Sequence, residues 1–199
     1  MEDTVDPTEY QKQVMYGAIL GDGRLERPKQ GNSRMQIRHS IRQEPYAVYK
    51  HEILKPLSLN LLSYTYFDSR TGRKYKQVGF NTVRHNYFTE LYHQFYRGGV
   101  KRIPEQLLSE MNEAALAILL GDDGTYDSSS NTVKISVDRY TYEDRELLRH
   151  WLKTSFKIDA SVQKDRIYIL RSSFPTLIRI VSNHLPRFMH YKLGLRPPP

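Results

Sequence analysis

The sequence predicts an α+β fold built from two pseudo-symmetric αββαββα halves. An apolar segment that ends in aspartate and glycine occurs twice, as "MYGAILGDG" at 15–23 and "LAILLGDDG" at 116–124. Stretches of alternating polarity follow each copy, and helical patterns come at matching places in both halves. The 199 residues are enough for two such units.

The repeated motif sets the register between the halves. Aligning the last acid before the final glycine pairs Asp22 with Asp123, half the chain apart. A single Gly-Asp-Gly after an apolar helix is most simply the turn that ends that helix. Two copies followed by the same order of elements favour a functional role instead.

Each motif is followed by a strand with one apolar and one polar face, expected at 34–41 and 132–139. A pair of strands is expected later in each half, at 63–83 and 160–170, with Thr71-Gly72 as the turn of the first pair. Alternation with period two distinguishes all of these segments from helices.

Helical patterns separate and follow these strands, at 44–57 and 86–96 in the first half and at 142–156 and 174–185 in the second. A segment with two glycines and a proline lies between the halves and is predicted as a linker. The expected organisation is an N-terminal half at 1–97, a linker at 98–104 and a C-terminal half at 105–199.

The chain is basic, with 30 Lys and Arg against 22 Asp and Glu, a net charge of +8 and a pI near 9.5. The excess is scattered along the chain, which is not the pattern of a disordered basic tail. A folded basic protein favours a polyanionic partner, of which nucleic acid is the commonest. A merely soluble cationic surface is the alternative.

Several classes of site and location are excluded or disfavoured by composition. The absence of cysteine excludes disulfides, thiolate nucleophiles and cysteine zinc sites. The seven histidines lack HExxH spacing, and no Gly-rich phosphate loop occurs. No apolar run approaches the roughly 18 residues of a bilayer span, and the acidic N-terminus is unlike a signal peptide. We expect a location in the cytoplasm or nucleoid, or in an organellar matrix, without secretion.

Both motifs contain small residues, Gly17 and Gly21 in the first copy and Ala117 in the second. Such residues would let two helix backbones approach closely. If the motif helices pack about a pseudo-twofold axis, Asp22 and Asp123 emerge together at their C-terminal ends. Two such carboxylates repel unless a cation joins them. Oxygen ligands alone favour a hard cation, and Mg²⁺ fits best.

The two motifs resemble those of the LAGLIDADG homing endonucleases, of the double-motif, single-chain kind encoded by mobile introns. Met15 and Ile118 depart from the nominal motif, but the small-residue register and the terminal Asp-Gly fit. The resemblance covers residues 14–195. It extends to "VKRIP" at 100–104 and "MHYKL" at 189–193, which look like the lysine-bearing segments that close each half.

This resemblance implies a monomer whose two sheets form a DNA-binding saddle, with the motif helices packed at its centre. It implies a staggered double-strand break in a long double-stranded DNA site by divalent-metal-dependent hydrolysis, with Mg²⁺ as cofactor and Mn²⁺ as a substitute. The implied catalytic residues are Asp22, Asp123, Lys101 and Lys192. The implied metal site comprises Asp22, Asp123, Gly21 and Asp122, with Asp122 turned about 100° from Asp123 on a helix and either supporting the site or solvated.

In the same interpretation, polar strand residues read the major groove, because Arg and Lys suit guanine while Gln and Asn suit adenine. The two halves carry different side chains at these places, so the site is expected to be non-palindromic. The candidates are Arg24, Arg34, Gln36, Arg38, Lys74, Lys76, Lys134, Ser136, Gln163 and Arg166.

Two other functions suit the same fold. One is an RNA-binding maturase that helps its own intron fold, and the other is a non-catalytic DNA-binding regulator. Both motif aspartates are present, which argues against a nuclease that has lost its activity. Dependence of cutting on Mg²⁺ separates an endonuclease from a protein that only binds.

Overall fold

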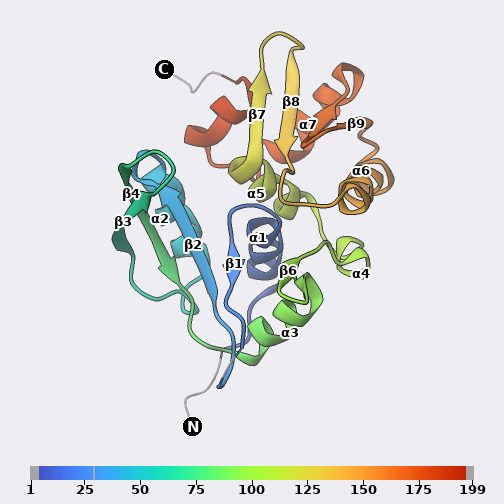
Figure 1. The fold of residues 1–199 in the computed structure, drawn as a ribbon. Helices are drawn as coiled ribbons and strands as arrows, with labels where there is room; N and C mark the ends of the chain where they lie inside the picture. Colours follow the sequence, from blue (N-terminus) through green and yellow to red (C-terminus); the bar gives the residue numbers. More distant parts are fainter. Residues whose placement is uncertain (1–4, 29, 196–199) are drawn as a thin grey trace. The chain divides into compact units, whose positions relative to one another are not determined.

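The computed structural model describes residues 5–28 and 30–195 and contains two four-stranded antiparallel sheets with helices around them (Figure 1). The chain divides into two compact units. The first comprises 1–12 and 22–93, and the second comprises 13–21 and 94–199. Most of the first motif therefore packs with the C-terminal part of the chain. Within the described ranges, no helix combines the length and apolar character needed to cross a membrane.

The first unit is built on a sheet with strand order β1-β2-β4-β3. Burial alternates along β2, where Met35, Ile37 and His39 point into the core, and α2 packs against β2 and β4. The element bounds are β1 (Arg24–Leu25), β2 (Met35–Ser40), η1 (Ile41–Gln43), α2 (Glu44–Ile53), β3 (Leu62–Asp68), β4 (Arg73–Asn81) and α3 (Asn86–Phe95), whose last two residues belong to the second unit.

The second unit repeats this plan with a sheet of order β7-β8-β10-β9. It also contains the greater part of α1 (Glu9–Leu20). The other bounds are β5 (Tyr96–Arg97), β6 (Val100–Lys101), α4 (Glu105–Leu108), α5 (Glu113–Asp123), β7 (Gly124–Asp127), β8 (Thr132–Ser136), α6 (Tyr142–Phe156), β9 (Ala160–Gln163), β10 (Arg166–Ile169), η2 (Arg171–Ser173), α7 (Phe174–Val181) and η3 (Arg187–Leu193).

The predicted α+β order is confirmed in both halves, and the helix expected at 142–156 has those bounds. Helix α2 ends at Ile53, earlier than expected, since Pro56 has no N–H with which to continue it. Residues 98–101 of the segment predicted as a linker complete the hairpin β5–β6. Gly98 and Gly99 form its turn, and both adopt positive φ, +59° and +83°, as a tight two-residue turn requires.

The motif helices α1 and α5 approach each other closely within the second unit. A Cβ built on Gly17 would lie 2.8 Å from the Cβ of Ile118 and closer still to the carbonyl oxygen of Ala115. Real Cβ atoms essentially never make such contacts, so the position requires glycine. The small residues therefore allow the packing of motif helices that the sequence predicts.

Candidate functional site

The two predicted lysines reach the C-terminal ends of the motif helices in the second unit. Lys101, on β6, donates from Nζ to the carbonyl oxygen of Gly21 at 3.1 Å. Lys192, on η3, donates to the carbonyl oxygen of Asp122 at 3.3 Å. Gly21 comes directly before the predicted aspartate Asp22, and Asp122 comes directly before the predicted aspartate Asp123. The two lysines thus make equivalent contacts at the two motifs.

The end of α1 receives two further donors. Arg139 donates to the Gly21 carbonyl oxygen at 3.2 Å, and the Tyr140 hydroxyl donates to the Leu20 carbonyl oxygen at 2.7 Å. Burial raises the pKa of Tyr140, which keeps the hydroxyl a donor. Cationic and hydroxyl donors suit the partial negative charge at a helix C-terminus. The sequence interpretation missed both residues, since nothing in the chain marks the segment after β8 as a neighbour of the first motif.

Asp122 lies against Gly21 in the second unit. A Cβ on Gly21 would be 2.5 Å from the Cβ of Asp122 and 2.7 Å from its Oδ2. Asp122 is only 7% exposed, so it is buried rather than solvated, whereas Asp123 is partly exposed at the end of α5. Glycine at position 21 therefore leaves room for a carboxylate beside the main chain that leads into Asp22.

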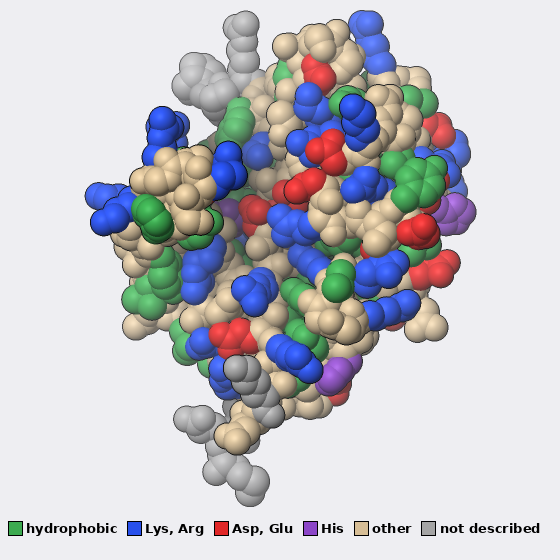
Figure 2. Space-filling model, viewed as in Figure 1, with side chains coloured by type: hydrophobic (Ala, Val, Ile, Leu, Met, Phe, Trp, Pro, Cys, Tyr) green, Lys and Arg blue, Asp and Glu red, His purple; other side chains and the backbone are tan. Residues whose placement is uncertain are grey.

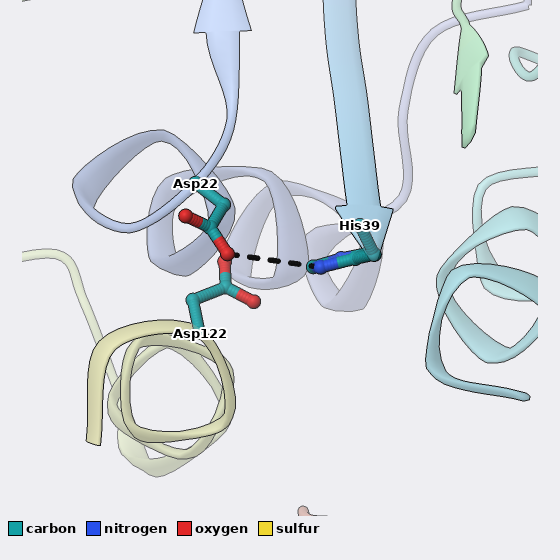
Figure 3. A group of neighbouring side chains, drawn as sticks. All are labelled: Asp22, His39 and Asp122. Atoms are coloured by element: carbon teal, nitrogen blue, oxygen red, sulfur yellow. Dashed lines mark ion pairs between the residues drawn. The ribbon is translucent and has the colours of Figure 1, made fainter. Parts of the chain in front are cut away.

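Asp22 belongs to the first unit, where its Oδ2 lies 3.7 Å from Nδ1 of His39 (Figure 3). The Asp22 side chain is 35% exposed, while that of His39 is 1% exposed. His39 in turn has its Nε2 3.3 Å from Nζ of Lys50, a fully buried residue of α2. Figure 3 also labels Asp122, which belongs to the second unit. The sequence places His39 on the apolar face of its strand but gives no sign of this neighbourhood.

The acids at the motifs offer oxygen donors from side chains and main chain. Asp22, Asp122 and Asp123 carry carboxylates, and the carbonyl oxygens of Gly21 and Asp122 lie at the motif ends. Oxygen donors of this kind suit Mg²⁺ or Mn²⁺ better than a soft metal. The chemistry of these residues is therefore compatible with the hard divalent cation that the sequence predicts.

On the first sheet, Arg24, Gln36 and Arg38 share one face, because Arg24 pairs with Gln36 and side chains alternate along β2. Arg38 stacks 3.9 Å above the centre of the Tyr64 ring and donates to the Phe80 carbonyl oxygen at 2.8 Å. These contacts fix the guanidinium in place.

Glu26 holds three polar side chains together on this face. It accepts from Arg34 and Gln36 at 2.8 Å each and from Arg84 at 2.7 Å. The hydrogen bond from Arg34 is the main reason that the pKa of Glu26 is below its usual value. Arg34 and Gln36 are therefore positioned beside each other before any ligand binds.

Lys74 and Lys76 are exposed but lie on the opposite side of their strand from Arg38. Arg38 pairs with Gly79, so alternation along β4 places Arg73 and Tyr75 on the Arg38 face and the two lysines on the other. The sequence grouped the lysines with the base-reading candidates because no register was available to separate the faces. Their contact with nucleic acid stays a prediction.

On the second sheet, all four candidates share one face. Ser136 pairs with Arg166, Arg166 pairs with Gln163, and Lys134 lies two residues before Ser136. Lys134 forms an ion pair with Asp127 at 3.2 Å. Hydrogen bonds from Ser129, and then from Lys134, lower the pKa of Asp127 to about 2.

Lys and Arg side chains are spread over the face of the molecule seen in Figure 2, among fewer Asp and Glu side chains.

Paired motif aspartates at helix ends, a lysine at each, and two antiparallel sheets with polar faces define the class of homing-endonuclease folds. A family model described as "LAGLIDADG DNA endonuclease family" matches residues 12–188. The chain therefore belongs to the LAGLIDADG DNA endonuclease family.

Individual relatives include both nucleases and maturases. The chain is 28% identical over 208 residues to DNA endonuclease I-ChuI of Chlamydomonas applanata, covering 94% of this chain and 95% of that protein. It is 29% identical over 198 residues to cytochrome b mRNA maturase bI2 of Saccharomyces cerevisiae, covering 91% of this chain but 46% of the maturase. The chain thus spans about half the length of that relative.

The fold also matches a solved structure. The homing endonuclease I-WcaI bound to its DNA recognition sequence superposes with a TM-score of 0.85 over 95% of this chain and 88% of that one, at 21% sequence identity. The similarity at this level of identity establishes the fold.

Proposed function

We propose that this chain is a site-specific homing endonuclease that makes a staggered double-strand break in a long, non-palindromic DNA site. The observation that carries the proposal is the pair of equivalent contacts at the motif ends, from Lys101 to Gly21 and from Lys192 to Asp122. Each motif keeps both an acid and a lysine, so each half has the groups needed to act on one strand.

The ligands of the divalent cation, Mg²⁺ or in its place Mn²⁺, would be Asp22 of the first unit and Asp123, Gly21 and Asp122 of the second. When bound, the cation supplies Lewis-acid activation of water and charge stabilisation at the phosphate. Lys101 and Lys192 fix the main chain directly before each aspartate. They also place positive charge where the phosphate would gain negative charge in the transition state. Catalysis then needs no covalent intermediate on the protein.

The polar faces of the two sheets would read the DNA. On the first sheet Glu26 holds Arg34 and Gln36 beside each other, and on the second Lys134, Ser136 and Arg166 share a face. Side chains fixed in advance lose less conformational entropy on binding. Because the two faces carry different donors and acceptors, one chain acting as a monomer would recognise an asymmetric site.

A cleavage selection on a randomised double-stranded DNA library with Mg²⁺ tests this function. The wild type is compared with Asp22→Asn and Asp123→Asn. Asp6→Asn, at an aspartate that precedes α1 and has a 90% exposed side chain, serves as the matched control. We expect one long asymmetric site to be enriched and cut by the wild type and the control. Each motif variant should nick one strand or lose activity. Tight selective binding without cutting in Mg²⁺ or Mn²⁺ would contradict the endonuclease and favour a DNA-binding regulator.

RNA binding is a second candidate function, favoured by the similarity to the yeast cytochrome b mRNA maturase. A basic surface that binds DNA can also bind structured RNA through its phosphates. Competition between the selected DNA site and the RNA of the intron that encodes the chain distinguishes the two. Weak, unselective DNA binding together with tight binding and folding of that RNA would make the maturase the main activity.

A further inference from the structure

His39 lies between the motif aspartate of the first half and a buried lysine. Its Nδ1 is 3.7 Å from Oδ2 of Asp22, and its Nε2 is 3.3 Å from Nζ of Lys50. Lys50 is fully buried on α2 and lies 4.4 Å from the centre of the Tyr46 ring, which itself is 5.1 Å from the His39 ring. His39 and Lys50 therefore both occupy the core of the first unit, with His39 next to Asp22. Figure 3 shows His39 pointing toward Asp22.

The contact with Lys50 determines which nitrogen of His39 carries the proton. When Lys50 is charged, its ammonium group has only hydrogens to offer, and Nε2 of His39 is then the acceptor. A neutral imidazole has one accepting nitrogen, and the proton therefore resides on Nδ1, the atom that faces Asp22. In this tautomer Nδ1 has no lone pair for a metal ion. In this tautomer His39 presents an N–H toward Asp22 at 3.7 Å, which is longer than a direct hydrogen bond, and it would not serve as a metal ligand.

The second half has apolar residues at both of the corresponding places. Arg24 pairs with Gln36 and Thr125 pairs with Lys134, so the residue that corresponds to His39, three positions further on, is Val137. The residue that corresponds to Lys50 is Leu148, the seventh of its helix as Lys50 is of α2. Both apolar residues are 1% exposed.

This comparison shows that packing alone does not require a histidine and a lysine in the first half. Taking charged or polar groups out of water is costly, and a buried ion or polar pair is commonly no more stable than an apolar pair of similar volume. The same fold accepts valine and leucine at these places in the second half. Stability therefore does not explain the polar pair in the first half. Because His39 lies beside Asp22, a role in the function of Asp22 is the explanation that we pursue.

We propose that His39 is a positioning residue for Asp22, that Lys50 sets its tautomer, and that this makes the first-half site chemically different from the second-half site. The proposal rests on the proposed role of Asp22 in DNA cleavage. An imidazole N–H that faces a carboxylate favours one orientation of that carboxylate by electrostatic attraction, and loss of such supporting partners typically costs about 10–100-fold in activity. The two strand cuts would then depend on different residues.

The first test reads the tautomer in metal-free protein. Long-range ¹H–¹⁵N correlation spectra of ¹⁵N-labelled chain distinguish a proton on Nδ1 from one on Nε2, and His39→Gln assigns the signal by its loss. We expect the Nδ1–H form in the wild type and a shift toward Nε2–H in Lys50→Met. His93→Gln, at an exposed histidine of α3, is the matched control. An Nε2–H form in the wild type, or no change in Lys50→Met, overturns the proposal.

The second test measures each strand cut separately in single-turnover reactions on end-labelled DNA. His39→Val with Lys50→Leu copies the second half and should fold with a melting temperature no lower than the wild type. We expect it to slow the cut that Asp22→Asn abolishes by about 10–100-fold, to leave the other cut and the DNA affinity unchanged, and to accumulate nicked product. Equal slowing of both cuts, or no slowing, would overturn the positioning role. If the wild type cuts no DNA, the endonuclease proposal fails and the role of His39 in cleavage with it, while the tautomer still reports whether Lys50 acts on His39.

Discussion

Gly17 of α1 lies so close to Ala115 of α5 that a side chain on Gly17 would collide with the Ala115 carbonyl oxygen. The backbone of α5 cannot give way easily, because Ala115, Leu116 and Leu119 are all buried at 1% exposure or less. The close approach of the motif helices therefore depends on the absence of a side chain at one position.

Gly17→Val should destabilise the protein by about 1–3 kcal/mol or more, since overpacking a tight contact forces the backbone to shift. Thermal denaturation followed by circular dichroism measures the change. Gly72→Asn is the matched control, because Gly72 is a left-handed turn residue with open space around it and asparagine tolerates that conformation. Equal melting temperatures for Gly17→Val and the wild type would contradict the packing argument.

Lys101→Met and Lys192→Met should each lower the cleavage rate by about 10²–10³-fold with little change in DNA affinity, because each removes one positioned charge from the site. Single-turnover cleavage and equilibrium binding are measured on the same DNA. Lys153→Met, at an exposed lysine of α6 paired with Asp159, provides the control. A parallel fall in affinity would instead indicate that the lysines serve mainly in binding.

The carboxyl group of Asp127 should titrate at about pH 2, as measured by ¹³C NMR. Hydrogen bonds from Ser129 and Lys134 stabilise the ionised form, so the folded pKa is below the ordinary value of 3.8. A lowered folded pKa contributes stability that is present above the unfolded value and is lost as the pH falls toward 2. The difference in melting temperature between wild type and Asp127→Asn should therefore shrink from pH 5 to pH 2.

Ser129→Ala tests the cause of that shift, because the Ser129 hydroxyl is the largest contributor. The titration midpoint of Asp127 should rise in this variant, and it should also rise in Lys134→Met. A midpoint near the ordinary aspartate value in the wild type would show that these hydrogen bonds do not persist in solution.

Arg166→Gln should relax the specificity of cleavage at one base pair by about 1–3 kcal/mol, since a bidentate contact from arginine to guanine carries discrimination of that size. Profiling cleavage over all single substitutions of the selected site gives the measurement. Uniform weakening at every base pair would indicate a phosphate contact instead.

Lys74→Gln should weaken DNA binding about equally for all sequences and reduce the slope of log affinity against log salt by about one. Lys74 lies on the opposite side of β4 from the base-reading candidates, so a phosphate contact is the role we expect for it. A change of base preference without a change of slope would contradict this role.

The repeated element order could be predicted from the sequence because each element depends on local pattern. Alternation of polarity over 132–139 predicts a strand, and the helical pattern of 142–156 predicts α6 with its observed bounds. Small residues in the motifs likewise predict a close approach of helices. The hairpin at 96–101 was missed, since paired glycines indicate a turn but not whether the flanking residues pair.

The environment of the motif ends depended on tertiary structure. Arg139 is distant in sequence from Gly21, which it contacts, and His39 is distant from both Asp22 and Lys50. Nothing in the local sequence indicates these partners. The separation of Lys74 from Arg38 needed the strand register, because a shift of one residue reverses every face.

The sequence by itself therefore determined the repeated plan, the two motif aspartates and the basic charge of the chain, because these follow from local periodicity, repetition and composition. Only the tertiary structure decided which donors meet the Gly21 and Asp122 carbonyls and which polar residues stand behind Asp22. Hydrogen bonds act over about 3 Å between atoms that the folded chain brings together, and no pattern along the chain contains those distances.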